Sequence, residues 1–219
     1  MKVCVLTANL NNFDTPVDPV KQSVGHGFHR FTDENFPPIK GLTPRFQYRI
    51  PKLFGWQFKT GYDYYIWLDG SVSLTHKDSI QWLLDKCYGY DFAVFNHPSR
   101  KTIKEEVDHL ESYLTRKAGT KKGQDYLIDR YENGLHKEQL EDITNDKDYT
   151  DDRLFASTTF VYKDSEHVRD VLRLWWLHQS RYYTCDQVVL PYILKDSAVN
   201  IIKEDPFNNK YTKRVSEHK

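Results

Sequence analysis

Residues 62–74 combine an unbroken run of aromatic and aliphatic side chains with an acidic turn. The run at 64–68 lacks the polar alternation of a half-exposed strand, which is typical of a strand covered on both faces in a sheet flanked by helices. Asp69 and Gly70 end the run, because this pair favours a turn. Ligands of open α/β sheets bind beyond the carboxyl ends of the strands. The sequence therefore predicts a binding site around Asp69.

The composition bounds the class of protein. The 219 residues fit one domain and can bury a sizeable core. The 31 basic and 31 acidic residues balance, so no global field favours a polyanionic partner. Cys4, Cys87 and Cys185 are too few and too widely spaced for a disulfide framework or a zinc site. The chain shows neither a signal peptide nor a membrane span, and we expect a soluble, cytoplasmic protein.

Strand and helix signals alternate along the chain, which predicts an α/β fold with one mixed sheet flanked by helices. Thr43 and Pro44 begin a helix that Pro51 is expected to bend or interrupt. Thr184 and Gln187 form a potential capping box for a last helix. The expected strands are 3–8, 28–31, 64–68, 91–96 and 154–162, and further helices are expected near 78–87, 103–114, 126–131, 168–176 and 185–194.

Two segments read as irregular. Residues 134–152 are strongly polar and are expected to form a mobile loop or an accessory segment. The polar, basic tail at 206–219 is expected to fray, which leaves residues 1–205 as the single domain. The chain has neither a Gly-x-Gly-x-x-Gly turn after its first strand nor a P-loop, which argues against a classical dinucleotide site.

Asp69 admits two interpretations. It can be a turn-capping residue after a strand. It can also be a hard oxygen ligand for Mg²⁺ or Mn²⁺ beside substrate phosphates, with the hydroxyl of Ser71 as an additional ligand.

A resemblance favours the second interpretation. Residues 66–71, Ile-Trp-Leu-Asp-Gly-Ser, resemble the strand and Asp-x-Asp-type turn of nucleotide-sugar glycosyltransferases with the GT-A fold. The match is to the glycosyltransferase-like family, formerly of unknown function, that includes plant mucilage and pollen-tube proteins and carries Trp-Ile-Asp-Gly here. Cys185 and Ser71 depart from the family's pattern. Other matching pieces follow in the family's order: Phe31-Thr32-Asp33, Arg49 with Lys52, His97-Pro98 with Arg100, Glu105-Glu106, Trp175-Trp176, Asp186-Gln187 and Tyr192.

The resemblance implies a GT-A-like, Rossmann-type mixed sheet and a site built from distant segments. Asp186 and Asp69 would be catalytic, with Asp186 orienting or deprotonating the acceptor. The other implied roles are donor binding by Thr7, Asn9, Asp33, Arg49, Lys52 and Arg100, and binding of a divalent metal, Mn²⁺ or Mg²⁺, by Asp69, Ser71 and His97.

Most of these residues also have an ordinary structural interpretation. Asp33 can be a loop residue, and Arg49 and Lys52 can lie on a solvated helix side. Asp186 can stabilise the first turn of a helix through its dipole. The remaining alternatives are His97 as a turn residue, Arg100 as a partner of Glu105 or Glu106, and Trp175 and Trp176 divided between the core and an acceptor cleft.

The resemblance implies transfer of a sugar from a nucleoside diphosphate sugar, expected to be a UDP-sugar, to an acceptor hydroxyl with the help of a divalent metal. One alternative is a non-catalytic nucleotide or glycan binder of the same fold. Another is a glycosyltransferase whose acceptor is a modified DNA base, and the neutral overall charge favours a carbohydrate acceptor over DNA. The local basic patches on which the DNA alternative depends are Lys117, Lys121, Lys122, Lys210, Lys213 and Arg214.

Overall fold

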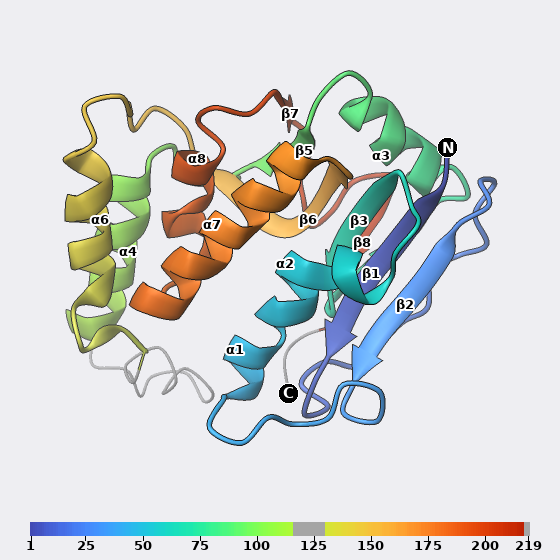
Figure 1. Ribbon diagram of the computed structural model, residues 1–219, viewed down its shortest axis with the longest axis horizontal. Coiled ribbons are helices and arrows are strands. Elements are labelled where there is room, and N and C mark those ends of the chain that lie inside the picture. The colour runs from blue at the N-terminus through green and yellow to red at the C-terminus, as the bar shows by residue number, and fades with distance from the viewer. Residues whose placement is uncertain (116–129, 217–219) are drawn as a thin grey trace.

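The protein is described by a computed structural model that covers residues 1–115 and 130–216 (Figure 1). One six-stranded sheet forms its centre, in the order β2-β1-β3-β6-β5-β7. β1 is parallel to β2 and β3, and β7 is parallel to β5, whereas β6 is antiparallel to both of its neighbours. The strands are β1 (Val3–Asn9), β2 (Gly27–Thr32), β3 (Tyr64–Asp69), β5 (Phe92–Asn96), β6 (Phe155–Lys163) and β7 (Val199–Ile202).

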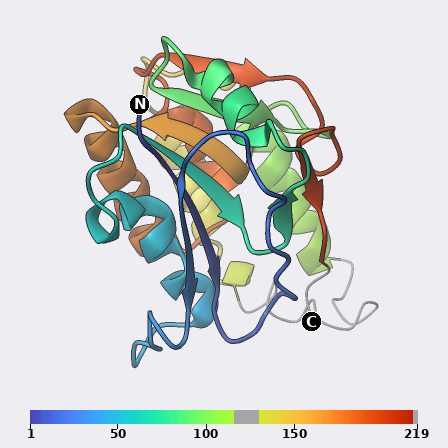
Figure 2. The ribbon, with the colours of Figure 1, turned by 90° about the vertical axis from the view of Figure 1, so that its right-hand side faces the viewer.

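Helices cover both faces of this sheet. Figure 2 shows α2 (Arg49–Phe58) and α7 (Glu166–Tyr182) on one side and α3 (Ser79–Cys87) on the other. The alternating side chains of β3 explain this arrangement: Tyr65 and Trp67 pack with α2 and α7, whereas Ile66 and Leu68 pack with α3. The fold class expected from the sequence, one α/β domain with a mixed sheet flanked by helices, is confirmed.

A third apolar cluster lies beside the sheet. α4 (Ile103–Thr115) and α6 (Leu135–Thr144) lie side by side there (Figure 1). The 3-10 helix η1 (Asp186–Val188) contacts both of them. α8 (Leu190–Ile193) follows η1 directly. In the part of the chain that the structure covers, no helix is long and apolar enough to cross a membrane.

Thr43 caps α1 (Pro44–Gln47) as predicted, because its side chain accepts a hydrogen bond from the Phe46 amide. Pro51 itself does not break the helix: the interruption lies at Tyr48, between α1 and α2, and α2 is kinked at Phe54, three positions after Pro51. Pro51 is accommodated in the first turn of α2, where its missing N–H has no intrahelical partner to lose.

Three other expectations about single elements are corrected. The polar segment 134–152 contains α6, whose buried side chains face α4 and α7. Thr184 does not form a capping box: its hydroxyl donates to Gln139 Oε1, and a 3-10 turn follows it. The tail does not fray at Thr212–Arg214, because these residues form β8, which pairs with β4 (Val72–Leu74).

Some expectations fall on positions outside the described residues. These are the basic segment with Lys117, Lys121 and Lys122 and most of the helix expected at 126–131.

Candidate functional site

A pocket of about 130 Å³ lies at the carboxyl ends of β1 and β3, the edge of the sheet where the sequence predicts a site. We call it the first pocket. Its described lining residues are Ala8, Asn9, Leu10, Phe13, Asp14, Pro44, Arg45, Tyr48, Asp69, Gly70 and Ser71.

Asp69 is anchored by two donors on the same oxygen. Its Oδ1 accepts hydrogen bonds from Trp67 Nε1 at 2.7 Å and from Lys52 Nζ at 3.3 Å. The side chain is still 25% exposed. Burial raises the pKa of Asp69, and both Lys52 and Trp67 oppose that rise. The carboxylate is thus held in one orientation while it lines the pocket.

Lys52 is fully buried and connects Asp69 to Asp186. Its Nζ lies 2.8 Å from Asp186 Oδ2, while Arg49 Nε lies 3.8 Å from Asp186 Oδ1. Ser157 Oγ also donates to Asp186 Oδ2, at 3.3 Å. A solvated helix side is therefore excluded for Arg49 and Lys52. Four aromatic rings lie around the Lys52 ammonium, with centroids 5.7–5.9 Å from Nζ: Tyr48, Trp67, Phe160 and Trp175.

Asp186, Lys52 and Arg49 stabilise one another's charged forms. Burial alone would raise the pKa of Asp186, but Lys52 and Arg49 outweigh it and bring this pKa to about 2. The pKa of Lys52 is raised because its carboxylate partners, Asp186 first and then Asp69, outweigh its own desolvation. Asp186, Lys52 and Arg49 are therefore charged at neutral pH. Asp186 is only 4% exposed and is connected to the pocket-lining Asp69 through Lys52.

The loop after β1 is shaped by two of the residues that the resemblance assigned to the donor. Asn9 exchanges two side-chain hydrogen bonds with the backbone of Asp14, at 2.9 and 3.0 Å. Asp33 accepts from the Asn11 amide through both carboxylate oxygens. Thr7 is buried within β1. Asn9 is among the residues that line the first pocket, whereas Asp33 acts on the loop through the Asn11 amide.

Sequence analysis missed Asp14, which lines the first pocket with Asp69. It is 6% exposed and lies against Gly70: a Cβ at Gly70 would come within 2.7 Å of Asp14 Oδ2 and of Ala8 O. The only sequence signal was Gly70 itself, since a glycine directly after Asp69 allows another segment to approach closely. Asp14 lies in an Asn-, Asp- and Pro-rich loop without periodicity, so the sequence did not predict that its side chain lies at the pocket.

His97 and Arg100 form a separate cluster. The ring Nδ1 of His97 accepts from the amides of Ser99 and Arg100, and Arg100 pairs with Glu106. Burial lowers the pKa of His97 and outweighs the opposing charge of Glu106. Neither His97 nor Arg100 is among the described residues that line the pockets. Within residues 1–115 and 130–216, no group of three His, Cys, Asp or Glu side chains is arranged to hold a metal ion.

A second pocket, of about 460 Å³, adjoins the first and shares Phe13, Pro44 and Arg45 with it. Trp175 is fully buried, and Trp176 stacks on Phe46 at a centroid distance of 5.1 Å, so neither tryptophan is among the described lining residues. The described residues that line the second pocket are Asn11, Phe13, Thr43, Pro44, Arg45, Arg130 and Tyr183.

No family model matches this chain, and no curated protein matches it. Among solved structures, the chain is similar to the galactosyltransferase LgtC, crystallised in complex with donor and acceptor sugar analogues. The match covers 90% of this chain and 72% of that chain, with 12% sequence identity and a TM-score of 0.43.

Proposed function

We propose that this chain transfers a glycosyl unit from a nucleoside diphosphate sugar, with UDP as the nucleotide, to a hydroxyl of a carbohydrate acceptor. The observation that carries the proposal is the anchored carboxylate of Asp69, which lines a pocket at the carboxyl ends of two parallel strands. Its local sequence, Trp67-Leu68-Asp69-Gly70, is also the piece that resembles the glycosyltransferase-like family.

The first pocket suits a divalent cation bound with phosphates. Asp69 and Asp14 contribute two carboxylates to its lining, and Ser71 adds a hydroxyl. Mg²⁺ and Mn²⁺ are commonly held by one or two carboxylates, with substrate phosphates and water as the other ligands. We propose that Asp69, Asp14 and Ser71 hold such an ion. When bound, it would neutralise negative charge on the departing diphosphate.

The remaining lining residues have distinct tasks in this proposal. Asn9, Phe13 and Tyr48 contact the nucleoside, since a planar base packs well against aromatic faces. Arg45 provides a positive charge beside the diphosphate. Lys52 is too deeply buried to reach the donor and instead orients Asp69. Asp186 and Arg49 act on the pocket through Lys52.

Binding of the donor nucleotide is the first test. UDP, GDP, CDP and ADP are added separately to the protein, with and without Mn²⁺, and the melting temperature is measured. UDP with Mn²⁺ at about 100 times its Kd is expected to stabilise the fold by about 2.7 kcal/mol, or roughly 5–11 °C for a chain of this size. If no nucleoside diphosphate changes the melting temperature under either condition, donor binding is refuted.

Asp69→Asn tests whether the Asp69 carboxylate is required for metal-dependent donor binding and for turnover. This variant is expected to lose the Mn²⁺-dependent part of the stabilisation and to lower UDP release from UDP-sugars by at least about a hundredfold. Asp152→Asn is the matched control, because Asp152 is exposed and its carboxylate forms an ion pair with the neighbouring Arg153. Equal, background-level UDP release by wild type and Asp69→Asn would instead favour a nucleotide binder without turnover.

A further inference from the structure

We propose that the second pocket binds the acceptor, and that this acceptor is a sugar that carries a carboxylate or a phosphate. The inference rests on the proposed function, because it assigns the donor to the first pocket and the acceptor to the pocket beside it.

The described lining of the second pocket is positively charged, which favours an anionic ligand. Arg45 and Arg130 both line it, and none of its described lining residues is acidic. The first pocket differs in this respect, since Asp14 and Asp69 line it together with Arg45. A guanidinium binds a carboxylate or phosphate oxygen more strongly than it binds a neutral sugar hydroxyl. An anionic group on the ligand would match both arginines.

Arg130 is built into the pocket rather than attached to its rim. The residue is 8% exposed, and its Nε donates to Tyr183 O at 2.7 Å while its Nη2 donates to Thr184 O. The rings of Tyr131 and Tyr183 lie 5.3 and 5.2 Å from the guanidinium carbon. These contacts fix the plane of the guanidinium and do not use Nη1. A fixed guanidinium favours planar carboxylate or phosphate oxygens over a hydroxyl.

Arg45 lies at the junction of the two pockets. It lines both of them, and its guanidinium carbon lies 4.7 Å from the centroid of the Phe13 ring. An anionic group bound between Arg45 and Arg130 would therefore hold the acceptor next to the donor. Proximity of this kind is a major part of the catalysis of group transfer.

Tyr183 provides a surface for the sugar ring. Its hydroxyl hydrogen-bonds Thr43 Oγ1 at 2.7 Å, and its ring meets Phe46 edge-on at 5.3 Å. Its backbone has a φ of 53°, in the left-handed region that residues other than glycine adopt rarely and at an energetic cost. The surrounding contacts thus hold this aromatic side chain at one place in the wall of the pocket.

The test uses three probes of similar size: glucose 6-phosphate, glucuronate and glucose. Binding of each to the wild-type protein is measured by isothermal titration calorimetry, without nucleotide and with saturating UDP and Mn²⁺. At least one anionic sugar is expected to bind about tenfold or more tightly than glucose. Saturating UDP is expected to leave that affinity within about threefold, because the donor occupies the other pocket. The preference between glucose 6-phosphate and glucuronate identifies phosphate or carboxylate as the natural group.

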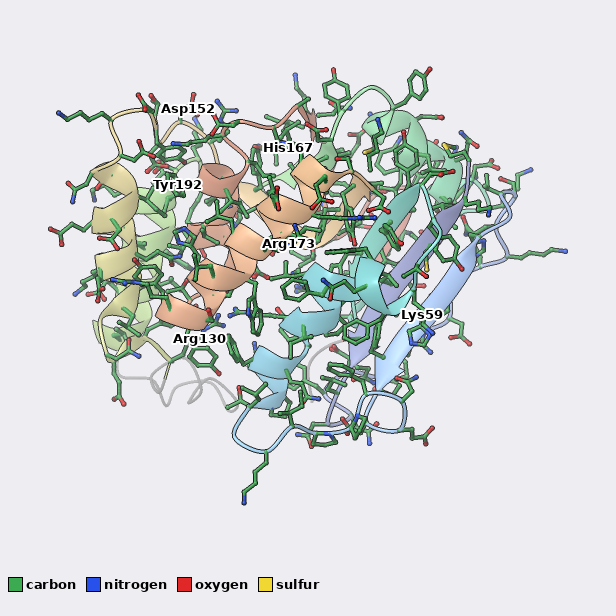
Figure 3. All side chains as sticks on the ribbon, in the orientation of Figure 1. Lys59, Arg130, Asp152, His167, Arg173 and Tyr192 are labelled. Atoms are coloured by element: carbon green, nitrogen blue, oxygen red, sulfur yellow. The ribbon has the colours of Figure 1, made fainter. Side chains whose placement is uncertain are left out.

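Variants locate the binding at Arg130. Arg130→Gln is expected to weaken the anionic probe about tenfold to a hundredfold and to leave UDP binding unchanged. Because Arg130 also binds two backbone carbonyls, Arg130→Lys is measured in parallel: it keeps a positive charge and is expected to lose less affinity than Arg130→Gln. Arg173→Gln is the control. Figure 3 shows Arg173 on α7, away from Arg130, and its side chain pairs with Glu166 and Asp170.

The outcomes separate this inference from the proposed function. If UDP stabilises the protein but neither anionic sugar binds more tightly than glucose, the inference is overturned and the proposed function stands. If UDP competes with the anionic probe, the second pocket belongs to the donor diphosphate and the inference is again overturned. If no nucleoside diphosphate binds, the proposed function fails and the assignment of an acceptor falls with it.

Discussion

At the scale of single residues, the site depends on the hydrogen bonds that orient one carboxylate. Trp67 and Asp69 are two positions apart on β3, so both side chains point to the same face of the sheet. The indole N–H donates to the charged form of Asp69 and therefore lowers its pKa. The ring itself packs in the core beneath the pocket.

Trp67→Phe tests this hydrogen bond. Loss of the donor is expected to raise the pKa of Asp69 further, so the acid limb of UDP–Mn²⁺ binding shifts to higher pH. The free energy of unfolding should fall by about 1–3 kcal/mol, because a smaller ring replaces a buried indole and a hydrogen bond is lost. Binding of UDP is measured from pH 4 to 9, and unfolding in urea at pH 7.

Trp82→Phe is the control for that experiment, since Trp82 lies on α3 on the other side of the sheet and stacks on Tyr211. Its acid limb should coincide with that of the wild type. An unchanged limb in Trp67→Phe would contradict the role given to the indole.

The sequence predicted part of this site. The position of Asp69 followed from an apolar run that ended in a turn, which is a local signal. Asp14 came from a loop whose path is set by side-chain bonds with Asn9 and by Asp33, 22 positions away from Asn11 in the chain. Such contacts leave no periodic pattern in a single sequence.

At the scale of elements, Lys52 and Asp186 connect α2 to η1 beneath the sheet edge, across 134 positions of the chain. The sequence showed basic residues at helical spacing, which is also the pattern of a solvated helix side. Their burial depends on a partner that is distant in the sequence. The apolar periodicity of α3, α4 and α7 predicted these helices correctly, whereas polar α6 was not predicted and the capping box expected at Thr184 is absent.

The ion pair makes a defined contribution to stability against pH. The folded-state pKa of Asp186 is about 2, below its ordinary 3.8, so its contribution is complete above about pH 4 and is lost as pH falls toward 2. The pKa of Lys52 is raised above its ordinary 10.5, so its contribution is complete below about pH 10 and is lost as pH rises further.

Lys52→Met is expected to destabilise the protein by about 3–5 kcal/mol at pH 7, because it leaves Asp186 buried with a more distant cation, Arg49. The pKa of Asp186 should rise, so acid unfolding begins at a higher pH than in the wild type. Urea denaturation between pH 3 and 7 measures both effects.

Lys86→Met is the control, because it removes a half-exposed ion pair with Glu204; it should lower the free energy of unfolding by at most about 1 kcal/mol. A loss in Lys52→Met as small as in this control would disprove the structural role of the buried pair.

At the scale of the whole molecule, residues 212–216 near the end of the chain pack against β4 and against the loop that follows β1. β8 pairs with β4, directly after the acidic turn, and the Val215 amide donates to Ser71 O. Ser216 Oγ accepts from the Thr15 amide and donates to Asp14 Oδ1. Sequence analysis missed this packing because residues 212–214 carry no alternation of apolar and polar side chains, and their partner strand is far away in the chain.

Truncation after Lys210 tests this packing of the tail. Loss of β8 exposes the edge of β4 and removes the stack of Tyr211 on Trp82, so the melting temperature should fall by about 4–8 °C, equivalent to roughly 2 kcal/mol. UDP–Mn²⁺ binding should weaken as well, since Asp14 and Ser71 lose contacts with the tail. Lys213→Ala is the control, because its side chain is exposed and the strand pairing uses its backbone. If truncation and Lys213→Ala have equal effects, the strand itself contributes nothing.

The three cysteines offer a way to observe local motion in the unmodified protein. All are free thiols, and burial raises the pKa of Cys4 to about 11 and those of Cys87 and Cys185 to about 12. Cys4 and Cys87 are buried, so a thiol reagent at pH 8 reacts with them mainly after the surrounding structure opens, whereas Cys185 is partly exposed in the folded protein. Cys4 reports on the central sheet, Cys87 on α3, and Cys185 on the segment next to Asp186. The order in which Cys4 and Cys87 are labelled ranks the opening free energies of the central sheet and of α3, and slower labelling of Cys185 in the presence of UDP would reveal tightening of the segment next to Asp186.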